Sequence, residues 1–354
     1  MPKIIGDVEL YMGPIQTGAP GDLELAIVSF IDGAQKRLDV AVQELDSPPI
    51  AYALVKARQR RVLVKVVIEH DYLREPRALM NPATVGGSHE VNRDLHAMLL
   101  RANIDVKTDY NTSIFHQKFI VRDRQSLLTG STNFTQTGTE RNLNHLVIIH
   151  DAVVAKTYAR EFSEISKGHF GKRNDGHNLV PEETVVSGIP IKVLFAPDHN
   201  PEMEIMKQMA KAKKRVDFAI FTFSQSSGID DQMLLLRRID MPLRGVMDLK
   251  QGVQRWSASH TLAEAGVELH TVAPTNIIGK LHHKLMVMDR QVIIAGSFNY
   301  TNPANTLNDE NIIILGDLET TDEASIQQQK DLAKYALNEI ERIIETHGSK
   351  YSPR

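Results

Sequence analysis

The chain has 354 residues, a formal net charge of -3 at neutral pH and no cysteine. This length fits two ordinary domains or one large duplicated unit, and either can bury a substantial core. Without cysteine the chain cannot form disulfides, zinc–thiolate sites, iron–sulfur clusters or a thiol nucleophile. The slightly acidic charge gives no overall attraction to nucleic acid, so any polyanion binding depends on local basic clusters.

The start of the chain and its hydropathy bear on the compartment. The first residues lack the basic stretch and apolar run of a signal peptide, and no segment approaches the roughly 18 uncharged apolar residues of a membrane span. We therefore expect a soluble, cytoplasmic protein without a transmembrane segment.

In chain order, helix-like and strand-like segments alternate through the first half. Residues 34–42 indicate a helix end that runs into a strand, 50–58 have helical periodicity, 62–68 form a β-branched run, and 91–100 are again helical. This alternation predicts an α/β fold with a mixed, mainly parallel β-sheet flanked by helices.

Each half of the chain has a loop after a predicted strand at which a substrate could bind. Residues 69–90 contain two prolines and a Gly-Gly pair and follow the 62–68 strand, where α/β folds place binding loops. A loop at the substrate entrance and an ordinary surface insertion fit this segment equally well. The counterpart after 243–249 holds the single tryptophan, Trp256. A lone tryptophan is more often a core residue than a base-stacking platform, so we expect Trp256 in the core.

The second half of the chain repeats the first. Residues 34–42 are echoed by 212–220, 99–108 by 262–271, and 146–151 by 312–317, in the same order. This predicts two similar halves, 1–166 and 191–354, joined by a linker over 167–190 that is rich in Gly, Asn, Asp, Glu and Pro. Residues 321–346 carry apolar side chains at helical spacing and predict a long amphipathic helix packed on the second half.

One polar motif, H-x-K-x4-D-x6-G-S-x-N, occurs once in each half with identical spacing. Because alternate residues of a strand share a face, each histidine should lie beside its lysine while the aspartate faces away and is structural. The same alternation should turn His283 away from its neighbour and give it a structural role. The two copies consist of His116, Lys118, Asp123, Gly130, Ser131 and Asn133, and of His282, Lys284, Asp289, Gly296, Ser297 and Asn299.

These residue types suit the cleavage of a phosphodiester. The two lysines and the amides of Asn133 and Asn299 can neutralise the phosphate, and the Ser131 and Ser297 hydroxyls beside their glycines are expected to bind its oxygens. A neutral imidazole can attack phosphorus while a second, protonated imidazole gives its proton to the leaving alkoxide. No histidine–carboxylate cluster has zinc spacing, so neither a metal nor a cofactor is expected.

The duplicated motif resembles that of the phospholipase D superfamily, and its G-S-x-N endings are most similar to the compact bacterial nuclease branch. The resemblance implies two phospholipase D-like halves with one active site at their interface, where both histidines meet. It implies a nuclease that cleaves DNA or RNA through a phosphohistidine. A phospholipase D or phosphatidyltransferase acting on phospholipid headgroups is the alternative and would need an apolar entrance. A module that only binds phosphate is disfavoured because both halves keep histidine and lysine. One chain supplies both half-sites, so a monomer suffices, and a homodimer stays open.

The two halves differ at one position that bears on the histidines. Glu310 lies 28 residues after His282, whereas Asn144 lies 28 residues after His116. In the resembling nucleases an acid at this place orients the motif histidine. The resemblance therefore implies that Glu310 acts in catalysis beside His282. It implies that Asn144 orients the ring of His116 without adding charge. A neighbouring carboxylate raises the pKa of an imidazole. His282 is therefore the expected proton donor, and His116 the expected nucleophile.

Overall fold

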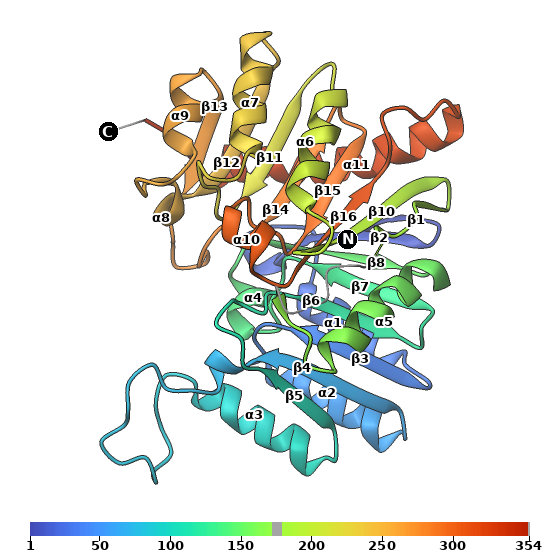
Figure 1. Ribbon diagram of the computed structural model, residues 1–354, viewed down its shortest axis with the longest axis vertical. Helices are drawn as coiled ribbons and strands as arrows, with labels where there is room; N and C mark the ends of the chain where they lie inside the picture. Colours follow the sequence, from blue (N-terminus) through green and yellow to red (C-terminus); the bar gives the residue numbers. More distant parts are fainter. Residues whose placement is uncertain (172–178, 353–354) are drawn as a thin grey trace.

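The computed structural model describes residues 1–171 and 179–352, which form two mixed β-sheets, one from each half of the chain (Figure 1). The first sheet has the strand order β1 (Lys3–Ile5), β2 (Val8–Gly13), β8 (Asn144–Ile149), β7 (Ser126–Gly130), β6 (Lys118–Arg122), β3 (Arg37–Val42), β4 (Leu63–Glu69), β5 (Asp105–Asp109). The second has the order β17 (Gly348–Lys350), β13 (Glu268–Val272), β12 (Leu243–Asp248), β11 (Val216–Ile220), β14 (Lys284–Met288), β15 (Val292–Gly296), β16 (Glu310–Leu315), β10 (Ile189–Ala196), β9 (Thr184–Val186).

Both sheets are mixed, as predicted, but they are not mainly parallel. Parallel pairs join β3 to β4 to β5 and β11 to β12 to β13, and the other strand pairs of the described residues are antiparallel. The motif segments cause this difference. Each runs as a strand, a short return strand and a third strand, and short connections of this kind join antiparallel neighbours, whereas parallel neighbours need a crossover.

Helices cover the outer faces of both sheets and fill the space between them. Apolar side chains of α1, α2 and α3 pack on the first sheet, and those of α6, α7 and α9 on the second. The α5 and α11 helices lie between the inner faces, in one core shared by both sheets. The helices are α1 (Leu23–Asp32), α2 (Pro48–Gln59), α3 (Glu90–Arg101), α4 (Gln136–Glu140), α5 (Ala152–Ile165), α6 (Pro201–Lys211), α7 (Ile229–Arg238), α8 (Leu249–Gly252), α9 (Ser259–Glu264), α10 (Asn302–Thr306), α11 (Glu323–His347), with short 3-10 turns η1 (Ile15–Thr17) and η2 (His70–Tyr72).

The predicted C-terminal helix is confirmed as α11, whose first turn is capped by the Asp322 carboxylate. It packs on the second half as expected and also reaches the first, where the Tyr335 hydroxyl accepts a hydrogen bond from the Met12 backbone (3.3 Å). The segments expected over 50–58, 62–68 and 91–100 are present as α2, β4 and α3. The shared core and this helix make the two halves a single packed unit.

The connection between the halves is more structured than a linker over 167–190 would be. Its last residues include β9, which pairs with β10 at the edge of the second sheet. Residues 172–178 of the predicted linker lie outside the described residues. Across 1–171 and 179–352, no helix combines the length and apolar character needed to cross a membrane.

The two motifs meet where the two sheets adjoin. Lys118 pairs with Val42 at the carboxyl end of β3, and Lys284 pairs with Ile220 at the carboxyl end of β11. Two short bridges then connect the halves: residue 115 to residue 309, and residue 143 to residue 281. Each position of one bridge follows its counterpart in the other by 166 residues, as His282 follows His116, so the junction has an internal two-fold symmetry.

Candidate active site

Both motif histidines are buried at this junction, and each is held by a residue of the opposite half. His116 Nδ1 lies 2.6 Å from Glu310 Oε2, and His282 Nδ1 lies 3.0 Å from Asn144 Oδ1. The bridges explain the exchange, because the His116 backbone donates to the Asp309 carbonyl (3.0 Å) and the His282 backbone to the Leu143 carbonyl (2.9 Å). Each histidine therefore sits beside the residue that follows its backbone acceptor.

This arrangement corrects the prediction that Glu310 orients the histidine of its own half. Glu310 is the partner of His116, and the histidine beside it in sequence, His282, receives only the amide of Asn144. By the argument that a carboxylate stabilises a protonated ring, His116 rather than His282 is the imidazole whose positive charge is stabilised. The prediction that His282 is the proton donor because Glu310 lies beside it was therefore based on the wrong pair of residues.

The two motif lysines are buried beside the histidines. The Lys118 ammonium donates to the His116 carbonyl (2.8 Å) and to Gln43 Oε1 (3.2 Å), and the Lys284 ammonium donates to the His282 carbonyl (2.9 Å). Burial lowers the pKa of Lys118 to about 7 and lowers the pKa of Lys284 well below its ordinary value. Both ammoniums therefore have a strong tendency to bind an anion, which would restore their charged form.

Burial also controls the titration of the histidines and of Glu310. It lowers the pKa of both rings well below the ordinary histidine value, and the neighbouring lysine charges lower it further. Burial raises the pKa of Glu310 to about 8, against the opposing influence of Lys118 and the Ser297 hydroxyl. Burial thus opposes the charged form of both members of the His116–Glu310 contact.

The motif serines bind the residues that hold the two histidines. The Ser131 hydroxyl donates to Asn144 Oδ1 (2.8 Å), and the Ser297 hydroxyl donates to Glu310 Oε2 (2.6 Å). Both serines are fully buried, and their backbone N–H groups bond to carbonyls of β8 and β16. The hydroxyls thus fix the partners of the histidines, and phosphate binding by these serines stays a prediction.

The glycines before these serines allow the strands to approach each other. Gly130 and Gly296 have φ of 155° and 138°, and a Cβ on either would collide with the carbonyl oxygen of His145 or of Asn311 on the adjacent strand. Only glycine fits here. The close approach brings Asn144 and Glu310 to the histidines.

The motif asparagines lie close to the lysines with part of their amide groups free. The amide nitrogen of Asn133 is 3.3 Å from Gln43 Oε1, and the side-chain oxygens of Asn133 and Asn299 are buried without a hydrogen-bond partner in the described part of the chain. Gln43 was missed by the sequence analysis. It binds both Lys118 and Asn133, and its own amide donates to the Tyr72 hydroxyl (3.3 Å).

Phe221 was also missed, and it occupies the place in the second half that Gln43 occupies in the first. Both residues come directly after the repeated segments 34–42 and 212–220, so extending the internal repeat by one residue would have identified them. The Phe221 ring lies 4.9 Å from the His282 ring, between centroids. The ammoniums of Lys284 and Lys280 lie 5.1 and 5.0 Å from its centroid.

The motif aspartates lie away from these groups, at the turns that end β6 and β14. The Asp123 carboxylate accepts three backbone N–H bonds from residues 35–37 (2.7 to 2.9 Å), and Asp289 accepts three from residues 213–215 (2.7 to 2.9 Å). Both aspartates have positive φ, near 56° and 52°, at these turns. These contacts attach each turn to the backbone that leads into the neighbouring strand, β3 in the first half and β11 in the second.

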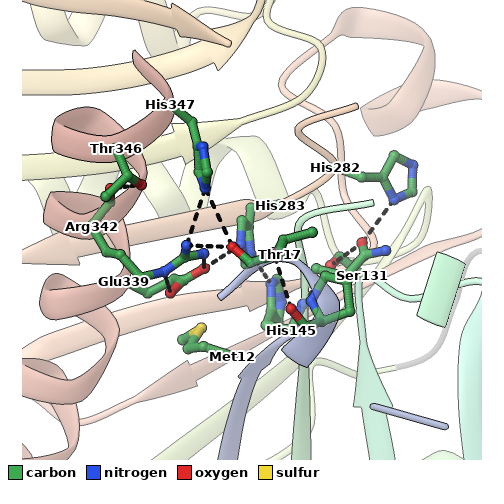
Figure 2. A network of polar contacts seen from close by, with 12 residues as sticks. Met12, Thr17, Ser131, His145, His282, His283, Glu339, Arg342, Thr346 and His347 are labelled. Atoms are coloured by element: carbon green, nitrogen blue, oxygen red, sulfur yellow. Dashed lines mark hydrogen bonds and ion pairs between the residues drawn. The ribbon is translucent and has the colours of Figure 1, made fainter. Parts of the chain in front are cut away.

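A second, deeper pair of histidines supports the junction (Figure 2). His145 and His283 stack with parallel rings 5.4 Å apart, and their Nδ1 atoms are 3.2 Å apart. Because the Gly296 N–H donates to His145 Nε2 (3.1 Å), neutral His145 carries its proton on Nδ1 and donates it to His283. His283 Nε2 then faces Glu339 of α11 at 3.8 Å. The turn of His283 away from its neighbour is as the strand alternation predicted.

Several exposed apolar side chains lie on the loops that leave the sheets beside the site. Met80 and Val85 are 106% and 83% exposed on the loop after η2, which projects from the body of the molecule in Figure 1. Tyr110 follows β5, and Ile277 follows β13. Trp256 is 44% exposed in the loop after α8, which contradicts the predicted core position. These loops leave the sheets at the carboxyl ends of the parallel strands, where the motifs lie.

Within residues 1–171 and 179–352, two groups of side chains have the geometry to hold a metal ion, with ligand atoms within 4.8 Å of one another: Glu69, His70 and Asp71, and Glu161, Glu164 and Asp198. Neither group contains a residue of the two motifs. Metal independence of the site stays a prediction.

Comparisons with known proteins agree with this geometry. The family described as "Cardiolipin synthase, PLD-like domain" matches residues 27–166 and 205–332. Over 133 residues the chain is 31% identical to the mitochondrial cardiolipin hydrolase of Xenopus laevis, covering 38% of this chain and 56% of that protein. It is 29% identical over 136 residues to phospholipase D of Rickettsia felis, covering 38% and 60%.

The chain thus spans a little over half the length of these curated relatives. A solved structure titled as the phosphatidylserine synthase of Haemophilus influenzae superposes with a TM-score of 0.69, covering 99% of this chain and 89% of that one, at 14% identity. That likeness concerns the fold. The family match covers both halves and more than half of the residues, and it includes both motifs. The chain therefore belongs to the phospholipase D superfamily, in the family of PLD-like domains.

Proposed function

We propose that this protein cleaves the headgroup ester of a phospholipid through a phosphohistidine on His116. The observation that carries the proposal is the pair of buried histidines, one from each half, each held through Nδ1 by the opposite half. Because Nδ1 of each ring is held by its partner, Nε2 is the ring nitrogen available for chemistry. Two lysines beside the rings supply the charge that a phosphate needs.

In the first step, His116 Nε2 attacks phosphorus, and the bond between phosphorus and the leaving alcohol oxygen breaks. In the reactive form Glu310 is a carboxylate that accepts Nδ1–H of the neutral His116 ring, so Nε2 has a free lone pair, and the same carboxylate stabilises the cation that the ring becomes on attack. His282, charged once the anionic substrate is bound, donates its Nε2 proton to the leaving oxygen. The assignment of His116 as nucleophile is thus kept, with a different reason: the ring that carries a lasting positive charge has the carboxylate.

In the second step, a water molecule gives its proton to the neutral His282 and attacks phosphorus, and the bond to His116 breaks. The products are a phosphomonoester and a free His116. An alcohol in place of water would give a new diester by the same route, so one site can perform hydrolysis or phosphatidyl transfer. The Asn133 and Asn299 amides and the two lysines bind the phosphate oxygens in both steps.

Two findings favour lipid over the nuclease that the motif endings suggested. The curated relatives above are, by their names, a cardiolipin hydrolase and a phospholipase D, so the nuclease expectation has no support from them. Exposed apolar side chains lie on loops at the carboxyl ends of the strands, where the motifs lie, and such groups fit a lipid surface better than a nucleic acid. Phospholipid is therefore the proposed substrate class in place of nucleic acid.

A parallel assay of the purified protein tests the substrate class. We expect headgroup release from phospholipid vesicles and little cleavage of single-stranded DNA, duplex DNA or RNA at low salt. Adding ethanol should yield some phosphatidylethanol if the phosphohistidine accepts alcohols. Because lysines and amides supply the positive charge, EDTA should leave the rate within about twofold.

Vigorous nucleic-acid cleavage without headgroup release would return the substrate class to nuclease. A loss of activity in EDTA that a divalent ion restores would contradict the metal-free scheme. The His116→Ala variant provides the blank for contaminating hydrolases in both arms of the assay.

The projecting loop should dock the enzyme on the membrane. Its base is fixed, because the Glu75 carboxylate binds Arg93 (2.7 Å) and accepts the Ser88 N–H (3.0 Å), while Met80 and Val85 stay exposed. Burying such side chains contributes roughly 1.5 to 3 kcal/mol each. Replacing both by serine should lower headgroup release from vesicles about tenfold or more, with no change on monomeric short-chain lipid.

The matched control is Ile239→Ser. Ile239 is 70% exposed but directly follows α7 and precedes β12, so it lies at the amino ends of the parallel strands, whereas the motifs lie at their carboxyl ends. It should leave both rates unchanged. An equal loss on vesicles and on monomeric lipid in the loop variant would mean that the loop shapes the site and does not dock it.

A further inference from the structure

The two sides of the active site have the same backbone but differ in one side chain. Two residues before each motif histidine, the first half has Ile114 and the second has Lys280. The carbonyl of Ile114 accepts the Asp309 N–H (3.2 Å), and the carbonyl of Lys280 accepts the Leu143 N–H (3.0 Å), so both occupy the same place at the symmetric bridges. One side thus carries an apolar group where the other carries a cation.

Lys280 faces the active site and has the aromatic ring of Phe221 as its neighbour. Its ammonium lies 5.0 Å from the centroid of the Phe221 ring, and no hydrogen bond or ion pair joins that ammonium to any residue in 1–171 or 179–352. Its charge acts on all four motif groups, since it lowers the pKa of both histidines and of both motif lysines. The side chain is half-buried, so part of it stays in contact with solvent.

The charges of the site indicate what this lysine is for. In the reactive form of the site the phosphodiester carries one negative charge and the Glu310 carboxylate a second, and these balance the ammoniums of Lys118 and Lys284. Lys280 is in excess of that balance. Of the two carboxylates that act on Lys280, Asp248 accepts backbone N–H bonds from Gln251 (3.2 Å) and Leu281 (3.3 Å). The other is Glu44, and burial raises its pKa to about 7.

We propose that Lys280 forms a subsite for a second anionic group, a phosphate or a carboxylate, on the leaving alcohol of the substrate. This rests on the proposed function, in which His116 attacks and the leaving group departs on the side of His282. Lys280 belongs to the half that supplies His282, whereas the nucleophile's side has Ile114. The substrate is therefore a diester whose leaving alcohol is itself anionic.

Two soluble diesters test the subsite without a membrane. Both are phenyl esters of phosphate, and their leaving nitrophenol either carries a ring carboxylate or does not. Wild-type enzyme should favour the carboxylate-bearing ester in kcat/KM. Lys280→Met should lower kcat/KM for that ester about 10- to 100-fold and for the plain ester less than about threefold, because a charge-assisted contact is lost only in the first case.

Two further variants separate a subsite from a general effect of charge. Lys280→Arg should keep the preference, and the exchange Lys280→Ile with Ile114→Lys, which restores the net charge on the wrong side, should not. An equal loss on both esters in Lys280→Met, or a preference restored by the exchange, would overturn the proposal. Circular dichroism of each variant identifies a folding defect, and Lys280→Arg still tests the subsite if Lys280→Met misfolds.

The lipid arm compares phosphatidylglycerol with the same lipid phosphorylated on its headgroup. Preference for the phosphorylated form in wild type, lost in Lys280→Met, supports the subsite on the proposed substrate. If neither lipid is cleaved but the soluble esters show the charge preference, the proposed function fails and the subsite stands. If lipids are cleaved without regard to the second charge, the subsite fails and the function stands.

Discussion

Replacing His116 with alanine should lower kcat by roughly 10⁴-fold and abolish the covalent intermediate, because no other group can attack phosphorus from that side. The sharper test uses bis(4-nitrophenyl) phosphate, whose leaving group departs without a proton. His282→Ala should still form a phospho-adduct with this substrate, on His116. The adduct should be long-lived because the base that activates water is missing.

His282→Ala is the matched control, since it removes the equivalent ring from the other half. Peptide mapping by mass spectrometry after a rapid quench locates the adduct. An adduct on His282 in the His116→Ala variant would reverse the two roles. Turnover by both single variants at wild-type rates would remove the phosphohistidine scheme altogether.

Replacing Glu310 with glutamine should have the next largest effect, a fall in kcat of about 10² to 10⁴-fold. The glutamine oxygen can still accept Nδ1–H of His116, but it cannot neutralise the imidazolium that forms when phosphorus is attached. Phospho-adduct formation should slow more than its hydrolysis, which rapid-quench measurements resolve. The variant should remain folded because the amide is nearly the same size and keeps the Ser297 contact.

The pH profile separates this effect from a structural one. A carboxylate forms as the pH rises, and burial raises the pKa of Glu310 to about 8, so kcat/KM should rise with pH on the acid side. The Lys118 ammonium is lost as the pH rises, and burial lowers its pKa to about 7, which gives the falling side. The two groups titrate as a coupled pair, so the profile is a bell that belongs to both. Glu310→Gln should lose the rising side and keep the falling one.

The equivalent position offers the control. Asn144→Asp places a carboxylate beside His282, the ring that already acts as acid and base, and should change kcat far less than Glu310→Gln does. A fall in the Asn144→Asp variant as large as that in Glu310→Gln, with the bell intact in both, would show that the two positions act only by shaping the site.

Many residues of the candidate active site could be predicted from the sequence because they lie close together along the chain in a motif of fixed spacing. The motif occurs twice with the same residue types, and few kinds of chemistry use this combination of histidine, lysine, serine and asparagine. The helical and strand periods of 50–58, 62–68, 91–100 and 321–346 depend on short-range patterns and gave elements that the structure contains. Phospholipase D superfamily membership and the two-half α/β fold follow from the same features.

The substrate class was harder to predict from the sequence. The motif endings carry the phosphate chemistry, which nucleic acids and phospholipids share, and they favoured a nuclease. The exposed apolar loops, where lipid and nucleic acid differ, lie outside the motif. Their exposure depends on where β4, β12 and β13 end in space, as Trp256 shows.

The tertiary structure alone decided which residues meet. A repeat read along the chain suggests that Glu310 serves His282, which lies in the same half, yet the bridges at Phe115 and Leu143 exchange the partners. The same packing turned the motif serines toward Asn144 and Glu310 and made most strand pairs antiparallel. Sequence determines which side chains are present and at what spacing. Their partners across the junction depend on how two sheets dock through a common core, and no local pattern encodes that contact.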